Sequence, residues 1–280
     1  MLKKSILAGL VAAVVLALVA APSLADGPKG TAVIKGKAVF DGSPPKPKAL
    51  PITGDNHCVQ AHTKPEADQG TIVYSKDGNT IPFVFVYVKN GIKDKYDPPA
   101  EPVLLDQKDC MYVPHVFGMI AGQQLNIRNS DPTNHNIHSL AKKNPAFNFA
   151  QPNAGMVKEL KGKETFNKEE IMVKVKCDVH AWMSTYCGVL THPFFAVTIS
   201  HENDGGDNAK RGSFEIKELP AGDYEVAAWH ETFGEVTQKV SVKDGETKEI
   251  EFKFGAKADA TPPKAREVIL SANTDADEKK

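Results

Sequence analysis

The sequence contains no CxxCH motif and no CxxC motif, although it has four cysteines. The first absence excludes covalently attached haem c, and the second argues against a thioredoxin-like thiol pair. Neither sign of charge dominates, with 34 Lys and Arg residues against 35 Asp and Glu residues. We therefore do not expect a nucleic acid or an anionic membrane surface as a partner. No Ser-His-Asp arrangement and no paired carboxylates indicate catalysis, so the chain is not expected to be an enzyme.

Long apolar runs are scarce, and the one that is present lies at residues 6–21. Two lysines precede it and Pro22-Ser23-Leu24-Ala25 follows it, which predicts a secretory signal peptide, residues 1–25, cleaved after Ala25. A membrane anchor is the alternative, but the run is barely long enough to span a bilayer. We therefore expect export to the periplasm or the extracellular space, with no membrane span after cleavage.

Long helical periods with caps are also missing between residues 26 and 256. Instead, short runs of β-branched and aromatic residues alternate with turn residues, which predicts an all-β sandwich or barrel. The run at 81–88 (IPFVFVYV) is apolar throughout, as a buried strand should be. Residues 43–70 and 90–108 are rich in Pro, Lys and Asp and are expected to form long surface loops. Further strands are expected at 33–40, 116–120, 125–128 and 171–176.

Residues with metal-binding chemistry concentrate in two segments. The first is NSDPTNHNIH at 129–138, and the second is the C-x2-H-x2-M loop CDVHAWM at 177–183. A thiolate and two imidazoles in a trigonal plane, with a weak axial thioether, form a blue-copper site. Soft sulfur ligands favour Cu(I) and imidazole suits Cu(II), so such a site can hold both states. The candidate ligands of one copper ion are His135, Cys177, His180 and Met183.

These two segments, with the strands that precede them, resemble the cupredoxin (blue copper) family. The copper site resembles those of amicyanin and plastocyanin, with amicyanin closest in loop spacing, and the resemblance covers roughly residues 80–198. It implies a Greek-key β-sandwich with long loop insertions, in which His135 is the first ligand and Asn136 braces the ligand loops. It also implies that His180 reaches the surface through an apolar patch, with Ala181 and Trp182 beside it, where redox partners dock.

Some residues have alternative interpretations. His138 could be the ligand in place of His135, although the His-Asn order favours His135. Met183 could fill the core, as Met residues usually do. Cys177 and Cys187 could form a structural disulfide in an oxidising compartment, which would leave His180 unexplained. We expect Cys58 to pair with Cys110. The remaining histidines, His57, His62, His115 and His201, are expected on surfaces or loops, with a weak second metal site at His57, Cys58 and His62 as an alternative.

The C-terminal part has a different pattern. Residues 212–254 alternate in strands at 213–216, 224–229, 237–242 and 247–254, separated by Pro-Ala-Gly-Asp and Lys-Asp-Gly-Glu turns. This part resembles the transthyretin-like or carboxypeptidase-regulatory β-sandwich module, which is generally structural or adhesive. His230 and Glu231 are expected to be a buried, hydrogen-bonded pair. The expected domains are a signal peptide (1–25), a cupredoxin-like copper domain with an N-terminal extension (26–198), a transthyretin-like module (199–256) and a disordered tail (257–280).

Three functions are compatible with these features. The first is a type 1 copper protein that carries single electrons between partners such as c-type cytochromes or a periplasmic dehydrogenase. The second is a copper-storage, delivery or sensing protein that uses the same ligands without redox cycling. The third, indicated only by the C-terminal module, is a carbohydrate- or surface-binding protein.

Overall fold

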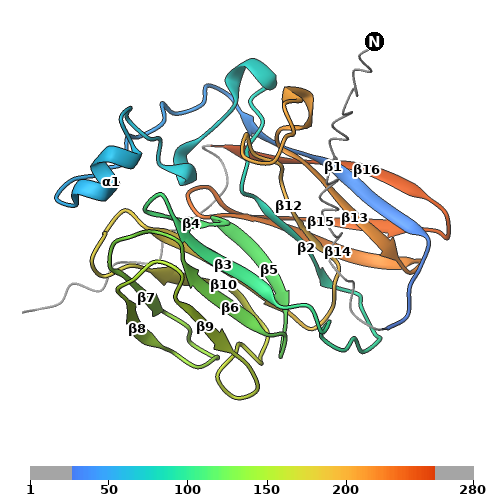
Figure 1. Ribbon diagram of the computed structural model, residues 1–280. Helices are drawn as coiled ribbons and strands as arrows, with labels where there is room; N and C mark the ends of the chain where they lie inside the picture. Colours follow the sequence, from blue (N-terminus) through green and yellow to red (C-terminus); the bar gives the residue numbers. More distant parts are fainter. Residues whose placement is uncertain (1–26, 256–280) are drawn as a thin grey trace, which may run out of the picture.

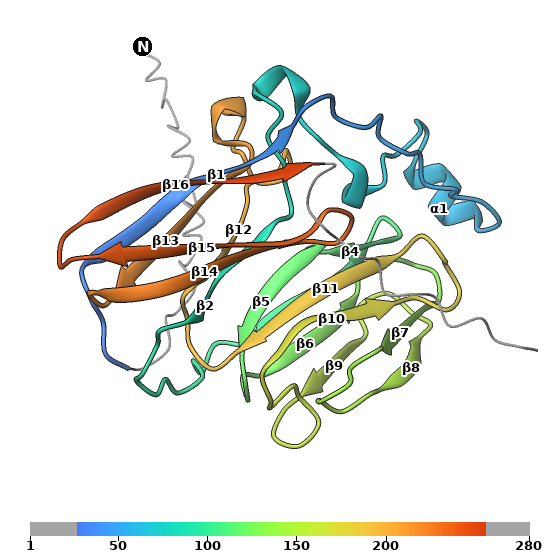
Figure 2. The ribbon, with the colours of Figure 1, turned by 180° about the vertical axis from the view of Figure 1, so that it is seen from behind.

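The computed structural model describes residues 27–255, so the expected signal peptide and tail lie outside the described residues. The described chain is almost entirely β-structure, as predicted, and its strands form four sheets. The sheets lie one on another as four layers (Figures 1 and 2). Three clusters of buried hydrophobic residues fill the spaces between the layers. Within residues 27–255, no helix is long and apolar enough to cross a membrane.

Two neighbouring layers form what we call the terminal sandwich. A three-stranded sheet, in the order β13-β1-β16, faces a four-stranded sheet, in the order β12-β2-β14-β15. Strand β1 lies in the middle of its sheet, antiparallel to β13 and parallel to β16. Inward side chains such as Ile34, Val226 and Phe252 fill the core between the sheets. The strands are β1 (Ala32–Asp41), β2 (Phe85–Asn90), β12 (Phe195–Val197), β13 (Ser213–Leu219), β14 (Gly222–His230), β15 (Gly234–Val242) and β16 (Thr247–Gly255).

The other two layers form what we call the inserted sandwich. A five-stranded sheet, β5-β11-β10-β7-β8, faces a four-stranded sheet, β4-β3-β6-β9. Its core contains Leu105, Ile127 and Val175 among other side chains. The strands are β3 (Val103–Lys108), β4 (Met111–Val113), β5 (Val116–Ile120), β6 (Leu125–Asn129), β7 (His135–Ser139), β8 (Asn148–Gln151), β9 (Val157–Leu160), β10 (Glu170–Lys176) and β11 (Ser184–Leu190).

The division into sandwiches differs from the expected boundary between residues 198 and 199. Strands β1, β2 and β12 were assigned to the copper domain, but they lie in the terminal sandwich with strands from residues 199–256. The inserted sandwich occupies residues 103–190, between β2 and β12. The continuous apolar run at 81–88 has a physical reason in this arrangement. Val86 faces the core of the terminal sandwich while Phe85 and Tyr87 face the inserted sandwich, so β2 is buried on both sides.

The two sandwiches share a packed interface between β2 and the pair β5 and β11. The rings of Phe85 and Phe195 stack there, with centroids 5.5 Å apart. Gly188 makes room for the first ring, because a Cβ at that position would lie 2.3 Å from the Phe85 side chain. Gly118 does the same for Phe195, also at 2.3 Å. The interface is therefore packed as tightly as a protein core.

The one α-helix of the described residues, α1 (Asn56–Ala61), lies in the long segment between β1 and β2. Asp55 is its N-cap and accepts a hydrogen bond from the Cys58 backbone N–H at 3.1 Å. Cys58 forms the expected disulfide with Cys110 (S–S 2.04 Å). We call residues 55–62 the cap, because they lie over one end of the inserted sandwich (Figure 1). Three 3-10 turns complete the fold: η1 (Gln69–Thr71), η2 (Ser75–Asp77) and η3 (Asn208–Lys210).

Candidate metal centre

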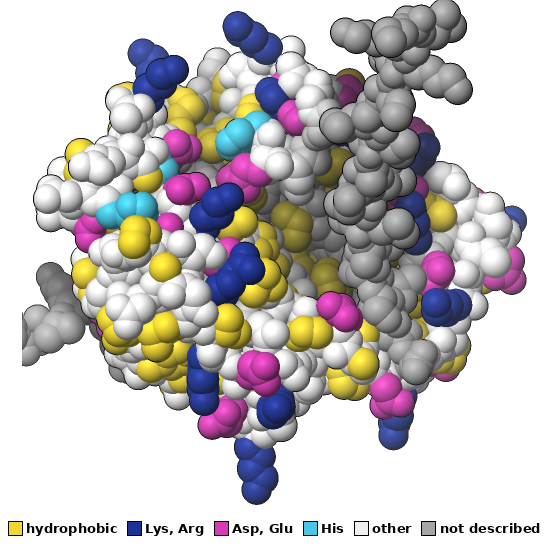
Figure 3. All heavy atoms as spheres, in the orientation of Figure 1, with side chains coloured by type: hydrophobic (Ala, Val, Ile, Leu, Met, Phe, Trp, Pro, Cys, Tyr) yellow, Lys and Arg dark blue, Asp and Glu magenta, His cyan; other side chains and the backbone are white. Residues whose placement is uncertain are grey.

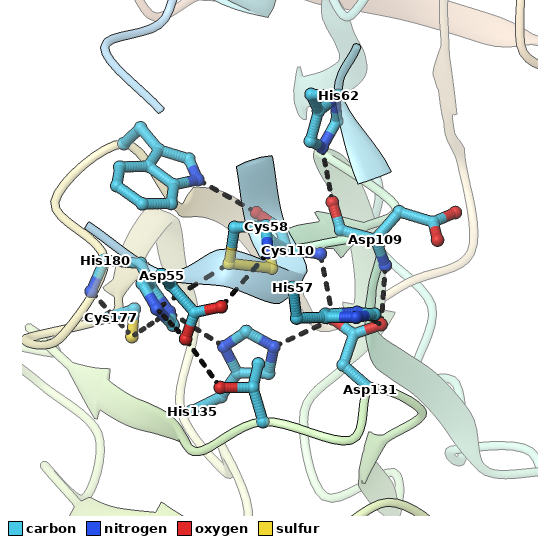
Figure 4. The surroundings of a disulfide bond; sticks show 12 residues. Asp55, His57, Cys58, His62, Asp109, Cys110, Asp131, His135, Cys177 and His180 are labelled. Atoms are coloured by element: carbon cyan, nitrogen blue, oxygen red, sulfur yellow. Dashed lines mark hydrogen bonds and ion pairs between the residues drawn. A yellow bond between two sulfur atoms is a disulfide. The ribbon is translucent and has the colours of Figure 1, made fainter. Parts of the chain in front are cut away.

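The structure brings three of the four predicted ligands into one cluster. His135 begins β7, whereas Cys177 and His180 lie in the loop between β10 and β11. Ligand atoms of these residues lie within 4.8 Å of one another, and all three residues are buried. The Nδ1 atoms of His135 and His180 are 3.0 Å apart, and the Cys177 Sγ lies 3.9 Å from the His180 Nδ1 (Figure 4). Three donor atoms thus point to a common position.

The loop at 177–183 is closed by its own backbone. The Cys177 N–H donates to the Met183 carbonyl at 3.1 Å, and the Met183 N–H donates to the His180 carbonyl at 2.9 Å. Met183 is fully buried and belongs to the same hydrophobic cluster as Cys177. The fourth candidate ligand is therefore anchored by the same short loop as the thiol and one imidazole.

The environment of the Cys177 sulfur favours a thiolate. Burial alone would raise the pKa of Cys177, but a hydrogen bond with His135 and backbone N–H groups, including those of His180 and Asn136, hold the pKa below its ordinary value. The two N–H groups lie 3.3 and 3.4 Å from the sulfur. Cys187 is the contrasting case, because burial raises its pKa well above the ordinary value. Both thiols are free, so the alternative Cys177–Cys187 disulfide is not formed.

Asn136 and His138 follow His135 on β7 and have different roles. The Asn136 side chain accepts a hydrogen bond from the Asp178 N–H and donates to Asn148, so it braces the ligand loop as the resemblance implied. His138 is half-buried and its Nδ1 lies 2.9 Å from a carboxylate oxygen of Asp178. It is not part of the cluster. The structure therefore places His135, and not His138, opposite Cys177.

Each histidine of the cluster faces a carboxylate with its other ring nitrogen. Asp131 Oδ2 lies 2.8 Å from the Nε2 of His135, and Asp55 Oδ2 lies 3.5 Å from the Nε2 of His180. Burial would raise the pKa of Asp131, but hydrogen bonds from His135 and from two backbone N–H groups bring it down to about 2. Sequence reasoning missed both aspartates. The signals were the position of Asp131 four residues before His135 and the N-cap pattern at Asp55.

The cap overturns one expectation about His180. That side chain was expected to be exposed in an apolar patch, but only 3% of it is accessible. The disulfide covers it, with the Cys58 Sγ 3.7 Å from the His180 Nε2. Trp182 closes another side: its ring centroid lies 5.0 Å from that of His180, and its Nε1–H donates to the Cys110 carbonyl. On the outside, His and acidic side chains are visible over α1 and the loops near it (Figure 3).

The other histidines are placed as follows. His62 contacts the Asp109 carbonyl and Glu66, whereas His57 faces Asp131. Among the described residues, the candidate ligand clusters do not join His57 with His62, and Cys58 is consumed by the disulfide. His115 was expected on a surface or loop, but it is buried between the sandwiches, where its Nε2 pairs with Glu231. The expected pairing of His230 with Glu231 is thus replaced by a pairing with His115.

The donor set fits copper. Two imidazole nitrogens and a thiolate, with a thioether on the same loop, are ligands that both Cu(I) and Cu(II) accept. The buried, hydrogen-bonded outer nitrogens of the two imidazoles leave the inner nitrogens for the metal. The cluster lies at the end of the inserted sandwich, where β7 and the β10–β11 loop meet. A rigid set of ligands of this kind holds a metal with little rearrangement.

No protein-family model matches the chain, and no curated protein matches it. Solved structures that it resembles include the copper-containing nitrite reductase NirK from Thermus scotoductus SA-01, at 19% identity and TM-score 0.27, covering 32% of this chain and 22% of that one. A purple cupredoxin from Nitrosopumilus maritimus matches at 21% identity and TM-score 0.26, covering 31% and 98%. An oxidised mutant of amicyanin matches at 18% and 0.27, covering 31% and 81%. Similarity of this extent carries no functional conclusion, which rests on the side chains of the site.

Proposed function

We propose that this protein is an exported, mononuclear type 1 copper protein that carries single electrons between redox partners and is not an enzyme. The observation that carries the proposal is the buried convergence of His135, Cys177 and His180, together with the lowered pKa of the Cys177 thiol. A structural cysteine in a core has a raised pKa, as Cys187 has. Its lowered pKa favours the thiolate form of Cys177, which binds a metal cation. The two imidazoles face the position that this cation would occupy.

The chain's own residues would hold the metal in a fixed frame. When bound, copper would supply the one-electron exchange between Cu(I) and Cu(II). His135 is fixed by β7, while Cys177, His180 and Met183 are fixed by a loop that its own hydrogen bonds close. The hydrophobic cluster and the cap exclude water from these side chains. Both oxidation states would therefore meet nearly the same ligand positions, which keeps the reorganisation energy low.

Redox partners, such as c-type cytochromes or a periplasmic dehydrogenase, would dock on a surface that differs from the expected one. Because His180 is buried, a partner would approach it across the cap and Trp182 instead of touching the imidazole edge. Electron-transfer encounters use small and weak interfaces, so a modest area is sufficient. Between His180 and the partner, electrons would cross only the cap or the Trp182 side chain.

A storage, delivery or sensing role is the second candidate, and the same burial favours it. The disulfide-bonded cap covers His180, so a metal bound there should be released slowly. Redox cycling separates the two roles. An electron carrier should be reduced and reoxidised repeatedly by a small cytochrome without losing copper, whereas a storage protein should stay in one oxidation state or release the ion.

The first experiment is copper reconstitution of the purified protein, followed by absorption and electron paramagnetic resonance spectroscopy. We expect one tightly bound copper and an intense visible band from Cu(II)–thiolate charge transfer. Cys177→Ser should abolish the band and remove most of the affinity, because a hard hydroxyl replaces the soft thiolate. Cys187→Ala is the matched control, since it removes the other free, buried thiol of the same sandwich.

The outcomes separate the interpretations. Retention of the band in Cys187→Ala and its loss in Cys177→Ser assign the colour to Cys177. A Cys177→Ser variant that stays fully coloured would contradict the ligand assignment. Tight binding of zinc with no visible band after copper addition would instead indicate a zinc site with the same residues.

A further inference from the structure

The inference concerns the cap and what it does to the two histidine ligands, and it rests on the proposed function. In Figure 4 the disulfide lies between two aspartates, and each aspartate faces one imidazole of the cluster. Asp131 is hydrogen-bonded to His135 at 2.8 Å, and Asp55 lies 3.5 Å from His180. The two carboxylates thus contact the two histidines on the sides that point away from the metal position.

Asp131 is held by the segment that contains Cys110. Its two oxygens accept hydrogen bonds from the backbone N–H groups of Asp109 and Cys110, both at 2.8 Å. Its own N–H donates to the Asn129 side chain at 2.9 Å. The carboxylate is almost completely buried. Its position therefore depends directly on the backbone at Cys110.

Asp55 is held in the same way by the segment that contains Cys58. One oxygen accepts the Cys58 backbone N–H at 3.1 Å, and the other accepts the Thr133 hydroxyl at 2.7 Å. That second oxygen is also the one that faces His180. Thr133 lies two residues before His135 in the first ligand segment. The cap is therefore linked to both ligand segments through a single carboxylate.

The disulfide joins these two arrangements. Cys58 donates its N–H to Asp55 and Cys110 donates its N–H to Asp131, so one covalent bond connects the two residues that hold the carboxylates. The same bond covers the Nε2 of His180 at 3.7 Å. Its two cysteines are fully buried. A disulfide that served only stability would need neither carboxylate next to an imidazole.

We propose that the Cys58–Cys110 disulfide, with Asp55 and Asp131, is a clamp that positions both histidine ligands and controls how fast copper leaves. Each carboxylate fixes the orientation of its imidazole and raises the electron density on the ring, which strengthens the bond to Cu(II). The disulfide fixes the distance between the carboxylates and keeps water from His180. Asp55, Asp131 and the two cysteines are positioning residues, since they act through the ligands.

The test compares two N-cap aspartates in the copper-loaded protein. Asp55→Asn keeps the cap hydrogen bond, because Asn caps helices as well as Asp does, but removes the charge that faces His180. Asp68→Asn is the matched control, since Asp68 caps η1 through the Gly70 N–H in the same long segment. Outer residues of this kind typically contribute about 10- to 100-fold to metal affinity. We expect Asp55→Asn to release copper to a chelator about 10-fold faster, with a higher reduction potential, and Asp68→Asn to match the wild type.

A second variant tests the disulfide itself. Cys58→Ala/Cys110→Ala should release copper at least as fast as Asp55→Asn and should alter the electron paramagnetic resonance parameters of Cu(II), because both imidazoles lose their fixed partners. Wild-type release rate, potential and spectrum in Asp55→Asn would overturn the clamp while leaving the copper site intact. Absence of the thiolate band in the wild type would instead contradict the proposed function. Wild-type copper release in a folded double variant would overturn the role of the disulfide. If the double variant fails to fold, Asp55→Asn still decides whether the carboxylate that faces His180 controls copper release.

Discussion

Both sandwiches bury histidines, but the surroundings of those histidines differ. In the inserted sandwich, His135 faces Asp131 with one ring nitrogen and His180 with the other. In the terminal sandwich, His230 stacks on Phe233, with ring centroids 4.5 Å apart, and its Nδ1 accepts backbone N–H groups. Burial alone therefore does not distinguish a ligand from a structural histidine. Convergence with other donors does, whereas a carboxylate beside the ring does not, because buried His115 also pairs with one.

Sulfur is divided between the sandwiches in the same way. All four cysteines belong to the core cluster of the inserted sandwich, together with Met183. The core of the terminal sandwich, within the described residues, consists of aliphatic and aromatic side chains without cysteine or methionine. The cysteine sulfur atoms, and with them the candidate soft ligands Cys177 and Met183, are thus concentrated in one sandwich. The core of the terminal sandwich, within the described residues, offers no sulfur ligand, which is consistent with a structural role.

We expect the largest effect from acid, which should lower the stability of the terminal sandwich through its buried histidines. Burial lowers the pKa of His230 to about 4, and burial lowers the pKa of His192 to about 4 as well. Between pH 6.5 and 4, the unfolded chain binds a proton at each residue that the folded chain does not, so stability falls as the pH falls. One pKa unit corresponds to about 1.4 kcal/mol, so each histidine costs about 3 kcal/mol at about pH 4.

Urea unfolding of the copper-free protein at about pH 7 and about pH 4.5 would measure this loss. His230→Asn retains an acceptor near the Nδ1 position but does not titrate, so it should lose less stability on acidification than the wild type. Its stability at neutral pH should be somewhat lower, because the stacking on Phe233 is lost. Equal pH dependence in the variant and the wild type would show that His230 is not the group responsible.

A smaller effect should follow from a change at the interface of the two sandwiches. Gly188→Ala places a Cβ 2.3 Å from the Phe85 ring, which is fully buried. Overpacking of this kind costs about 1–3 kcal/mol. The visible band of the copper-loaded protein should not change, because the strain arises on the interface and not in the ligand loop.

The companion variant Phe85→Leu tests the cause. In the double variant Gly188→Ala/Phe85→Leu, the smaller side chain gives the new methyl group space, so the combined loss should be less than the sum of the two single losses. Additive losses would mean that the two residues do not meet. A single cooperative unfolding transition, with both sandwiches unfolding together, would agree with their shared core.

Features of the fold and of the candidate site that depend on neighbouring residues could be predicted from the sequence, whereas those that depend on contacts between distant residues could not. The strands expected at 33–40 and 247–254 match β1 and β16 within one residue at each end, whereas the strand expected at 213–216 ends three residues before the end of β13. The two candidate ligand segments could be singled out because His135 and the C-x2-H-x2-M loop carry local motifs. Strand β3 was missed because its pattern lies inside a stretch rich in Pro, Lys and Asp, 90–108. Its stability comes from pairing with β6, which local sequence does not show.

The site's outer residues were missed for a related reason. Cys58 lies 122 residues before His180 in the sequence, and Asp55 lies three residues before Cys58. Only folding brings these two residues next to the His180 imidazole. The make-up of the terminal sandwich was hidden for the same reason, because β1 is far from β13 and β16 in sequence but lies between them in the sheet. The expected exposure of His180 came from the family resemblance. This chain departs from it through the inserted cap.

The smallest predicted effect concerns the aromatic ring that covers a histidine in each sandwich. Phe233 stacks on His230 with an interplanar angle of 13°, whereas Trp182 lies against His180 at a tilt of 38°. Trp182 also donates its Nε1–H to the Cys110 carbonyl at 3.1 Å. Trp182→Phe keeps an aromatic ring on His180 and removes that hydrogen bond, whose net contribution is about 1 kcal/mol. Urea unfolding should show that loss, with an unchanged visible band. Phe233→Leu should also lower stability but leave copper release at the wild-type rate, because no ligand touches it. A visible band that changes in Phe233→Leu but not in Trp182→Phe would contradict this comparison. It would mean that the surroundings of His230, and not those of His180, affect the copper site.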